Sequence, residues 1–426
     1  ILEFEQDYSN VRSIRLEQNY RSTTGILDLA NAIIRHNRRR HRKDLWSDLG
    51  QGEKPQLLNH RDETEEANQT AKMVVRLHAE GVPYGQMAVL YRTNAQSRVF
   101  EYAFLQEEIP HAIVGSLHFY QRKEIRDLLA YLAVLSNPSD AESLLRIINE
   151  PPRGIGQTTV NRLLAHAAKT RGTLYQALQN SASIEEIGPS LKKKLVEFSE
   201  KLDDWRKLAR EAPVLDLVKE LMDYLDLVNL YKQSKDPEDI SRVENLIEFV
   251  GSVSEFSECW AEEHDTPPRL DDFLPFVALQ TDMDRMDSGA DSVRLMTLHN
   301  AKGLEFGCVF IVGLEDELLP HRMSLDSHEA IEEERRLFYV GVTRAKTRLF
   351  LSYAKCRRLY DTFYYTKPSQ FLQELDESLF AGSNDQTDFT PAPRHRPKTR
   401  HRITEKDKQF RIGQQVWHSE YGKGMI

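Results

Sequence analysis

Apolar residues follow two different periods along this chain, and the change of period divides it into parts. Short apolar runs of the kind that form buried strands lie at residues 56–58, 87–91, 112–114, 293–298, 309–312 and 349–353. Segments with apolar residues three and four apart separate several of these runs, as the helices of a doubly wound sheet do. The pattern therefore predicts an α/β fold built on a parallel sheet.

Between about residues 116 and 286 the strand pattern is absent and the helical period remains. Apolar residues at helical spacing recur at 128–135, 144–148, 163–168, 191–208, 214–230 and 243–253. This stretch is expected to form an all-helical domain inserted into the sheet domain. We therefore predict a sheet domain in two parts, residues 1–115 and 287–380, with a helical insert at 116–286.

From about residue 381 the chain becomes polar. Residues 381–410 hold Pro391, Pro393 and Pro397 and almost no large apolar side chain, which is typical of a flexible, disordered linker. Apolar residues return at 411–426, where a further strand is expected to begin. The sequence therefore predicts a fourth and a fifth segment after the sheet domain.

Composition adds limits to this picture. The chain of 426 residues is 40% hydrophobic and 29% charged, as in an ordinary soluble protein, and no apolar run approaches the roughly 20 residues of a membrane span. Its formal net charge of −9 argues against a surface coated in basic residues, although nucleic-acid binding depends on local positive potential. Cys259, Cys308 and Cys356 have neither metal-ligand spacing nor the pattern of a disulfide framework. We expect a reducing cytoplasm and no metal site in this chain.

The segment 334–354 carries the most specific pattern. A helical period that includes Arg336, Thr343, Arg344 and Lys346 gives way to the apolar run 349–353. An arginine between a helix and a core strand can be aimed rigidly at a phosphate, because its guanidinium is planar and stays charged. Helix ends also carry arginine simply to complement the helix dipole, so the local pattern alone leaves both interpretations open.

A second segment, 16–23, reads LEQNYRST. Alternating apolar residues at 11, 14 and 16 predict a strand, and Ser22, Thr23 or Thr24 is expected to cap a helix whose apolar face continues to residue 34. Tyr20 and Arg21 are then at a strand-to-helix junction, where a ring can stack on a base and a guanidinium can reach a phosphate. A buried tyrosine beside a surface arginine is the alternative.

A third segment, 293–306, reads VRLMTLHNAKGLEF. It predicts a strand, a short polar loop and a second strand, and loops at the ends of central strands are where α/β proteins place their sites. His299, Lys302 and Glu305 are spaced to project from this loop. Arg92 and Asn94 follow another predicted strand at a similar junction.

Inside the helical insert, residues 151–160 read PPRGIGQTTV. The turn Gly154–Ile155–Gly156 exposes backbone N–H groups before a helix that Thr158 is expected to cap, and Arg153 is beside it. Such a turn can hold a DNA phosphate without reading base sequence. Gly-x-Gly turns are also common as purely structural features, and the turn alone does not decide between the two.

Taken together, QNYRST, TLHNAKGLEF and the run ending GVTRAK resemble motifs IV, V and VI of superfamily 1 DNA helicases of the UvrD/PcrA/Rep type. Their order and the large insert between motifs IV and V also match, and the resemblance covers roughly residues 11–380. It implies a RecA-like sheet domain, called 2A, interrupted by a helical domain, called 2B. Residues 411–426 resemble the start of the small SH3-like or Tudor-like domain that ends such proteins.

The resemblance implies a role for each candidate residue. Arg344 and Arg21 would contact the γ-phosphate of ATP and stabilise the transition state, Tyr20 would stack on adenine, and Glu305 would accept a hydrogen bond from ribose. His299, Arg92 and Asn94 would contact single-stranded DNA. Arg153, Gly154, Ile155, Gly156 and Thr158, as the turn of a helix-hairpin-helix element, would contact the duplex at a junction. The implied setting is the bacterial cytoplasm at the nucleoid, with no membrane, and with repair or transcription proteins binding the C-terminal tail.

One motif of such helicases is not found in the sequence. No Gly-x-x-x-x-Gly-Lys-[Ser/Thr] loop occurs in the printed chain, so ATP and its Mg²⁺ are expected to depend on an N-terminal half that is missing. Glu315, Asp316 and Glu317 follow an apolar strand as Walker B carboxylates do, but without a P-loop lysine we expect them to form a solvated turn. The chain is thus expected to be a C-terminal fragment of a 3′→5′ helicase, inactive alone.

Two other functions are compatible with parts of the sequence. A non-catalytic DNA-binding or partner-binding module would also lack the P-loop, but it would have no obvious use for Tyr20, Arg21, Glu305 and Arg344 together. A helicase-nuclease subunit of the RecB or AddA type would carry nuclease carboxylates in a C-terminal domain, for which the sequence leaves no room.

Overall fold

The computed structural model describes residues 15–38, 40, 43–232, 236–283, 291–359, 362–381, 415–418 and 422–425. Its centre is a parallel sheet of six strands in the order β1-β6-β5-β2-β4-β3. The strands are β1 (Gln56–His60), β2 (Met87–Tyr91), β3 (His111–Val114), β4 (Val293–Thr297), β5 (Phe306–Ile311) and β6 (Ala345–Ala354). Each overlaps one of the six apolar runs, and the expected α/β fold with a parallel sheet is confirmed.

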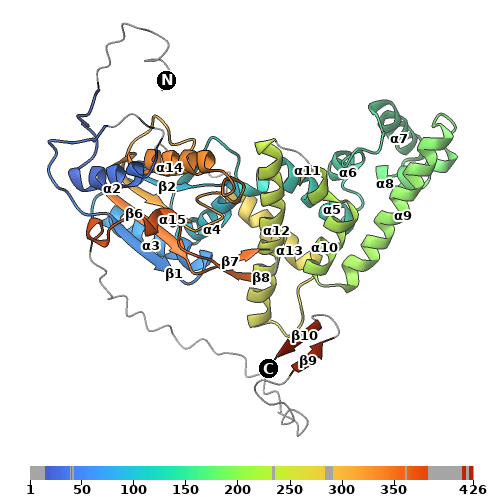
Figure 1. Ribbon diagram of the computed structural model, residues 1–426. Coiled ribbons are helices and arrows are strands. Elements are labelled where there is room, and N and C mark those ends of the chain that lie inside the picture. Colours follow the sequence, from blue (N-terminus) through green and yellow to red (C-terminus); the bar gives the residue numbers. More distant parts are fainter. Residues whose placement is uncertain are drawn as a thin grey trace. The chain divides into compact units, whose positions relative to one another are not determined.

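Helices cover both faces of this sheet (Figure 1). Helices α2 (Thr24–Arg35), α14 (His328–Val342) and α15 (Gln370–Gln373) share one apolar core with the sheet, and α3 (Glu63–Ala79) and α4 (Ser97–Gln106) share the other. Gly341 allows α14 to approach closely, because a Cβ at this position would meet Leu298 Cδ2 at 2.4 Å. Burial on both sides explains why the strands read as continuous apolar runs.

The connection between β4 and β5 is unusual for a parallel sheet. Both strands pair with β2, so residues 298–305 must run from the carboxyl end of one strand to the amino end of the other. Such crossovers normally contain a helix. Here a loop makes the crossing, and Leu298 and Ala301 are buried in the same core as α2 and α14. We call residues 298–305 the crossing loop.

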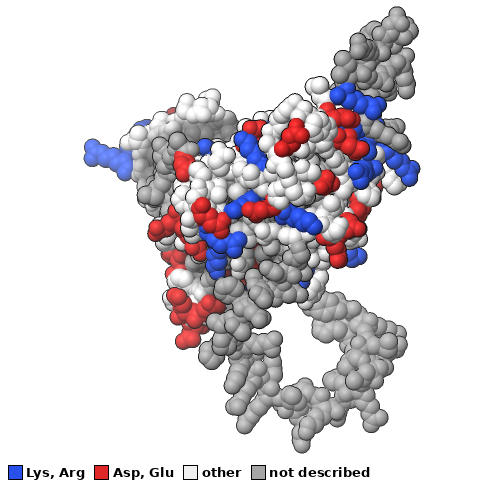
Figure 2. All heavy atoms as spheres, turned by 90° about the vertical axis from the view of Figure 1, so that its left-hand side faces the viewer, with Lys and Arg blue, Asp and Glu red and all other residues white. Residues whose placement is uncertain are grey.

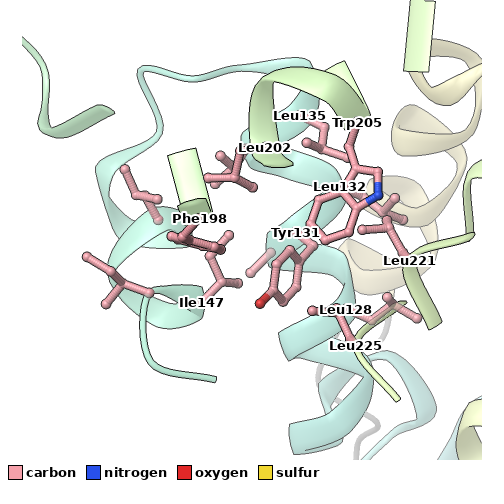
Figure 3. Packing of buried hydrophobic residues seen from close by; sticks show 14 of the residues in the cluster. Leu128, Tyr131, Leu132, Leu135, Ile147, Phe198, Leu202, Trp205, Leu221 and Leu225 are labelled. Carbon is pink, nitrogen blue, oxygen red and sulfur yellow. The ribbon is translucent and has the colours of Figure 1, made fainter. Parts of the chain in front are cut away.

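Between the two parts of the sheet, the described residues from 116 to 283 form helices and turns without a strand. The helices are α5 (Lys123–Ser136), α6 (Ala141–Ile147), α7 (Gln157–Thr170), α8 (Leu174–Gln179), α9 (Pro189–Glu211), α10 (Val214–Tyr224), α11 (Leu227–Lys232), α12 (Pro237–Glu263) and α13 (Leu270–Met283). Their shared core contains Tyr131, Phe198, Leu202 and Trp205, and Trp205 is 2% exposed (Figure 3). The helical insert therefore has its own hydrophobic core.

Two antiparallel pairs complete the description. Strands β7 (Cys356–Leu359) and β8 (Thr362–Tyr365) form a hairpin after β6. Near the end of the chain, β9 (Gln415–His418) pairs with β10 (Gly422–Met425). Most of the expected linker, including its three prolines, lies outside the described residues.

Two local expectations were wrong, and the expected cap of α2 was met in position only. Residues 15–17 form no strand, although Gln18 makes an isolated bridge with Trp46, and residues 11–14 lie outside the described part. Thr23 occupies the N-cap of α2 but makes no side-chain capping bond. Glu315 is not in a solvated turn: it is fully buried and forms a hydrogen-bonded ion pair with Arg357, which also pairs with Glu66 at 2.6 Å. A short apolar strand followed by acids does not reveal that a later arginine will neutralise them.

Among the described helices, none combines the length and the apolar character needed to cross a bilayer.

Candidate functional site

Arg21, Glu305, Arg344 and Lys346 come from three distant segments and meet beside the amino ends of β5 and β6; we call them the arginine cluster. Glu305 immediately precedes β5, and Arg344 immediately precedes β6. The cluster thus lies at the opposite end of the strands from the usual site of α/β proteins. Arg21 and Lys346 pair with the Glu305 carboxylate and Arg344 lies near it, which leaves a local excess of positive charge.

Backbone pairing with β6 places Arg21. Ser22 Oγ donates to the carbonyl of Ala345 at 2.6 Å, and Thr23 N donates to the carbonyl of Lys346 at 3.0 Å. Arg21 Nε then donates to Glu305 Oε2 at 2.6 Å, and its Nη1 donates to the carbonyl of Thr343 at 3.1 Å. The start of α2 is therefore attached to the connection between α14 and β6, and this attachment orients the Arg21 side chain.

Arg344 is held by the chain around it. Its Nε donates to the carbonyl of Val340 at 2.9 Å, its Nη1 to the carbonyl of Leu304 at 3.1 Å, and its Nη2 to Thr343 Oγ1 at 3.0 Å. Burial and then the positive charge of Arg21 lower the pKa of Arg344 from its ordinary value. Two guanidinium groups that repel each other would both gain from an anion between or beside them.

Glu305 and Tyr20 differ in how available they are. Hydrogen bonds from Lys346 and Arg21 lower the pKa of Glu305 to about 2, so this carboxylate is ionised and already has two partners. Its expected bond to ribose therefore requires a rearrangement or a shared contact. The Tyr20 ring is 79% exposed, and its hydroxyl donates to Gln18 Oε1 at 2.7 Å. Its ring face is thus open to a planar ligand.

A second group of candidates lies at the carboxyl ends of β2 and β4. Arg92 follows β2 and donates from Nε and Nη2 to the two carboxylate oxygens of Glu334, at 2.9 and 2.8 Å. His299 lies in the crossing loop, where partial burial and then the charge of Arg92 lower its pKa. Asn94 begins a short 3-10 turn beside Arg92. The structure thus places Arg92, Asn94 and His299 at the carboxyl ends of β2 and β4, and Arg92 is already paired with Glu334.

The glycine turn of the helical insert is only partly as expected. Gly154 and Gly156 are exposed, and Gly156, rather than Thr158, occupies the N-cap of α7. Ile155 is buried in the core, 2% exposed. Arg153 points inward: its guanidinium donates to Tyr131 Oη and to the carbonyls of Ile147 and Pro151, and lies 4.4 Å from the Phe198 ring centre. The backbone N–H of Ile155 donates to Asn149 Oδ1 at 3.0 Å, and the side chains of Arg153 and Ile155 serve the fold, so only the exposed Gly154 and Gly156 are left to offer backbone N–H groups.

Positive and negative side chains are mixed on the face of the molecule that Figure 2 shows. On the face at the left of Figure 1, Lys and Arg side chains are interspersed with Asp and Glu, without a field of one sign (Figure 2). Within the described part of the chain, no group of three or more His, Cys, Asp or Glu side chains is placed to hold a metal ion. A bound anion would therefore depend on small clusters such as Arg21, Arg344 and Lys346.

Sequence reasoning missed two residues that shape these sites. Glu334 holds Arg92 from a helix 242 positions later, and Asn300 donates from Nδ2 to the carbonyl of Val114 at 3.1 Å. Glu334 is one of several acidic residues at the start of α14, and nothing in the local pattern distinguishes it. Asn300 stands between two residues that the sequence did single out, His299 and Lys302, which is the one signal that could have indicated it.

Comparison with known proteins agrees with these motifs. A family model described as the UvrD-like helicase C-terminal domain matches residues 14–356. The chain is 38% identical over 440 residues to the ATP-dependent DNA helicase PcrA of Staphylococcus epidermidis (strain ATCC 12228 / FDA PCI 1200) and 38% identical over 427 residues to DNA helicase II of Escherichia coli (strain K12). It is 37% identical over 447 residues to the ATP-dependent DNA helicase PcrA of Bacillus subtilis (strain 168).

Each of these alignments covers 100% of this chain and 59% of the relative, so the chain spans about three fifths of the proteins it matches. Among solved structures, the C-terminal domain of a possible DNA helicase from Lactobacillus plantarum WCFS1 aligns over 85% of this chain and 98% of that chain. Its TM-score of 0.33 and identity of 11% are too low to support an argument. The family match rests on the sequence: this chain belongs to the UvrD-like helicase C-terminal domain family.

Proposed function

We propose that this chain provides the second motor domain and the inserted helical domain of an ATP-dependent DNA helicase that moves 3′→5′ on single-stranded DNA and unwinds duplexes. In the domain division expected from the sequence, residues 1–115 and 287–380 form the motor domain 2A and residues 116–286 form 2B. ATP and Mg²⁺ would be held largely by an N-terminal half that carries the P-loop, and this chain would complete the nucleotide site.

The observation that carries the proposal is the arginine cluster. Arg21 and Lys346 pair with Glu305, Arg344 lies close enough for the charges of Arg21 and Glu305 to shift its pKa, and Tyr20 is exposed on the segment that carries Arg21. Guanidinium groups fixed by a scaffold stabilise the charge that develops on a transferred phosphoryl group without reorganising during the reaction. Arg344 and Arg21 are therefore assigned to the γ-phosphate and Tyr20 to the base.

DNA contact is assigned to two other surfaces. His299, Arg92 and Asn94 lie at the carboxyl ends of β2 and β4, and we assign them to the phosphates and bases of a single strand, with His299 the most exposed of the three. The backbone N–H groups of the exposed residues Gly154 and Gly156 are assigned to duplex phosphate. Because Arg153 donates inward to Tyr131, its contribution there is to hold the turn in shape.

The test combines this chain with the N-terminal half of the helicase and measures ATP hydrolysis with and without single-stranded DNA. We expect DNA-stimulated hydrolysis by the combination and none by this chain alone. Unwinding of a duplex with a 3′ tail, but not of one with a 5′ tail, would support the direction. A combination that binds DNA and never hydrolyses ATP would instead identify the chain as a non-catalytic binding module.

A further inference from the structure

Asn300 connects the crossing loop to the segment that leads into the helical insert. Its Nδ2 donates to the carbonyl of Val114, the last residue of β3, at 3.1 Å. The next residue, Gly115, has φ of +80°, and a Cβ at Gly115 would meet Asn300 Nδ2 at 2.3 Å and Cγ at 2.7 Å. The amide of Asn300 therefore occupies the space that any other residue at 115 would need.

The chain that follows Gly115 soon enters a buried polar network. His118 Nδ1 lies 3.1 Å from Glu101 Oε2 on α4, and Phe119 N donates to the same oxygen at 3.2 Å. Arg122 Nη2 donates to Ser97 Oγ at 2.7 Å, and its Nη1 donates to Asn245 Oδ1 on α12 at 2.8 Å. Residues 115–122 are thus attached both to the sheet domain and to the long helix of the insert.

The other end of the crossing loop reaches the arginine cluster. The carbonyl of Leu304 accepts a bond from Arg344 Nη1, and Glu305 pairs with Arg21 and Lys346. The crossing loop runs from the carboxyl end of β4 to the amino end of β5 without a helix. One short segment therefore contacts Val114 and Gly115 near its start and the arginine cluster at its end. Displacement of Glu305 or Leu304 has a short covalent path to Asn300.

We propose that Asn300 is a positioning residue: through Val114 and Gly115 it passes a displacement of the crossing loop, caused by nucleotide at the arginine cluster, to residues 115–122 and so to the helical insert. This inference rests on the proposed function, because it takes nucleotide as the ligand of the cluster. Asn300 is not assigned a contact with ATP or DNA. Its role is to connect ATP hydrolysis at the amino ends of β5 and β6 with the helical insert that follows the carboxyl end of β3.

The alternative is that the Asn300 amide merely fills space beside β3. A double-mutant cycle tests whether residues 115 and 300 are energetically coupled, which both roles require. The exchange and unwinding measurements then separate the two roles, because only a positioning residue affects residues 115–122 and unwinding without lowering ATP turnover. Asn300→Asp keeps the size of the side chain and removes the Nδ2 donor. Gly115→Ala places a Cβ against the amide, and Gly115→Ala with Asn300→Ala removes that clash while leaving the positive φ.

The first measurement uses this chain alone, without ligand. Hydrogen exchange at residues 115–122 should become faster in Asn300→Asp by about threefold or more, while exchange in β1 and β6 stays at the parent rate. In the cycle, the cost of Gly115→Ala should be smaller in the Asn300→Ala background than in the parent. Unchanged exchange at 115–122, or strictly additive effects of the two substitutions, would overturn the proposal.

The second measurement uses the helicase reassembled from this chain and its N-terminal half. In Asn300→Asp, ATP turnover stimulated by single-stranded DNA should stay within about twofold of the parent, while base pairs unwound per ATP fall by about threefold or more. A residue that only supports the fold would reduce both together. Equal losses, or no loss, would reject the coupling role. If the reassembled helicase without substitutions did not hydrolyse ATP, the proposed function would be rejected. The hydrogen-exchange measurement would then still test the contact between Asn300 and Val114.

Discussion

Arg21 and Glu305 lie 284 positions apart in the sequence, yet Arg21 Nε is 2.6 Å from Glu305 Oε2. Both were expected to touch ATP, and the structure joins them to each other. Since Glu305 also pairs with Lys346, it serves as the shared counter-ion of a cluster that otherwise repels itself. A phosphate that enters the cluster would be a second anion for Arg21. The side chains of Arg21, Arg344 and Lys346, which are already held in place, would neutralise part of the negative charge of the phosphate.

Replacing Arg344 by Ala in the reassembled helicase should lower kcat for ATP by on the order of 100-fold, because a donor to the transition state is lost. The Kd for ATP should change much less, since the interaction strengthens as charge develops. Turnover and nucleotide affinity measured separately check this split. Arg336→Ala is the matched control, because Arg336 pairs with Glu332 on its own helix, one turn away. Near-parental turnover in Arg344→Ala would mean that its bonds to Val340 and Leu304 are its whole role.

Gly156→Val should weaken binding to a junction of duplex and single strand. No atom lies within 4 Å of a Cβ built at Gly156, and its φ is −84°, so the fold tolerates the change while the exposed N–H groups of the turn become less accessible. Gly188→Val is the control, because Gly188 also caps a helix and also has open space around it. Fluorescence anisotropy with junction DNA should show a several-fold rise in Kd for Gly156→Val alone, because a phosphate contact of the turn is lost.

ATPase stimulated by single strands alone should be unaffected by Gly156→Val, since it is assigned to His299 and the sheet domain. Equal weakening by both valine variants, or parental junction binding by Gly156→Val, would contradict the assignment of this turn to duplex DNA.

The sequence predicted those features that depend on local pattern. Strands buried on both faces are apolar throughout, and the helices of the insert keep their period over many turns, so the six strands and the strand-free insert were foreseeable. The three motifs that meet around Arg21, Glu305 and Arg344 were also foreseeable as a group, because they were recognised together.

Partners chosen by tertiary folding could not be predicted in this way. Arg153 looked like a free cation beside a glycine turn, but Tyr131 Oη and two carbonyls take up its guanidinium. Glu315 looked solvated, but Arg357 reaches it from 42 positions later. In each case the residue type fits both a surface and a buried role, and only the distant partner decides between them.

Arg357→Ala should strongly destabilise the chain. Arg357 is the shared partner of two fully buried carboxylates, Glu66 and Glu315, and its removal leaves both charges uncompensated. Breaking a buried ion pair in this way typically costs roughly 3–5 kcal/mol. Arg61→Ala removes an exposed arginine paired with Asp62 and should cost less than about 1 kcal/mol. Urea unfolding of the two variants checks the difference, and similar midpoints would show that the buried cluster is not a net support of the fold.

Glu101 should make the stability of the chain depend on acid. Burial raises the pKa of its carboxyl, but bonds from His118 and Ser97 and the charge of Arg122 outweigh burial and hold the pKa at about 2, below its ordinary value of 4.5. A carboxyl with a depressed pKa stabilises the fold fully above pH 4.5, and this contribution is lost as the pH falls toward 2. The loss amounts to at most about 1.4 kcal/mol per pH unit.

Glu101→Gln is the variant that isolates this contribution, because it keeps the shape of the side chain and cannot ionise. The free energy of unfolding should be lower in Glu101→Gln than in the parent at pH 6. The gap should narrow steadily from pH 4.5 to pH 3, because Glu101 of the unfolded parent takes up a proton in this range while the folded carboxylate stays ionised. Other acids titrate in both proteins and cancel in the difference. A gap that stays constant over this range would mean that folding does not lower the pKa of Glu101, and that Arg122 is held by Ser97 and Asn245 without its help.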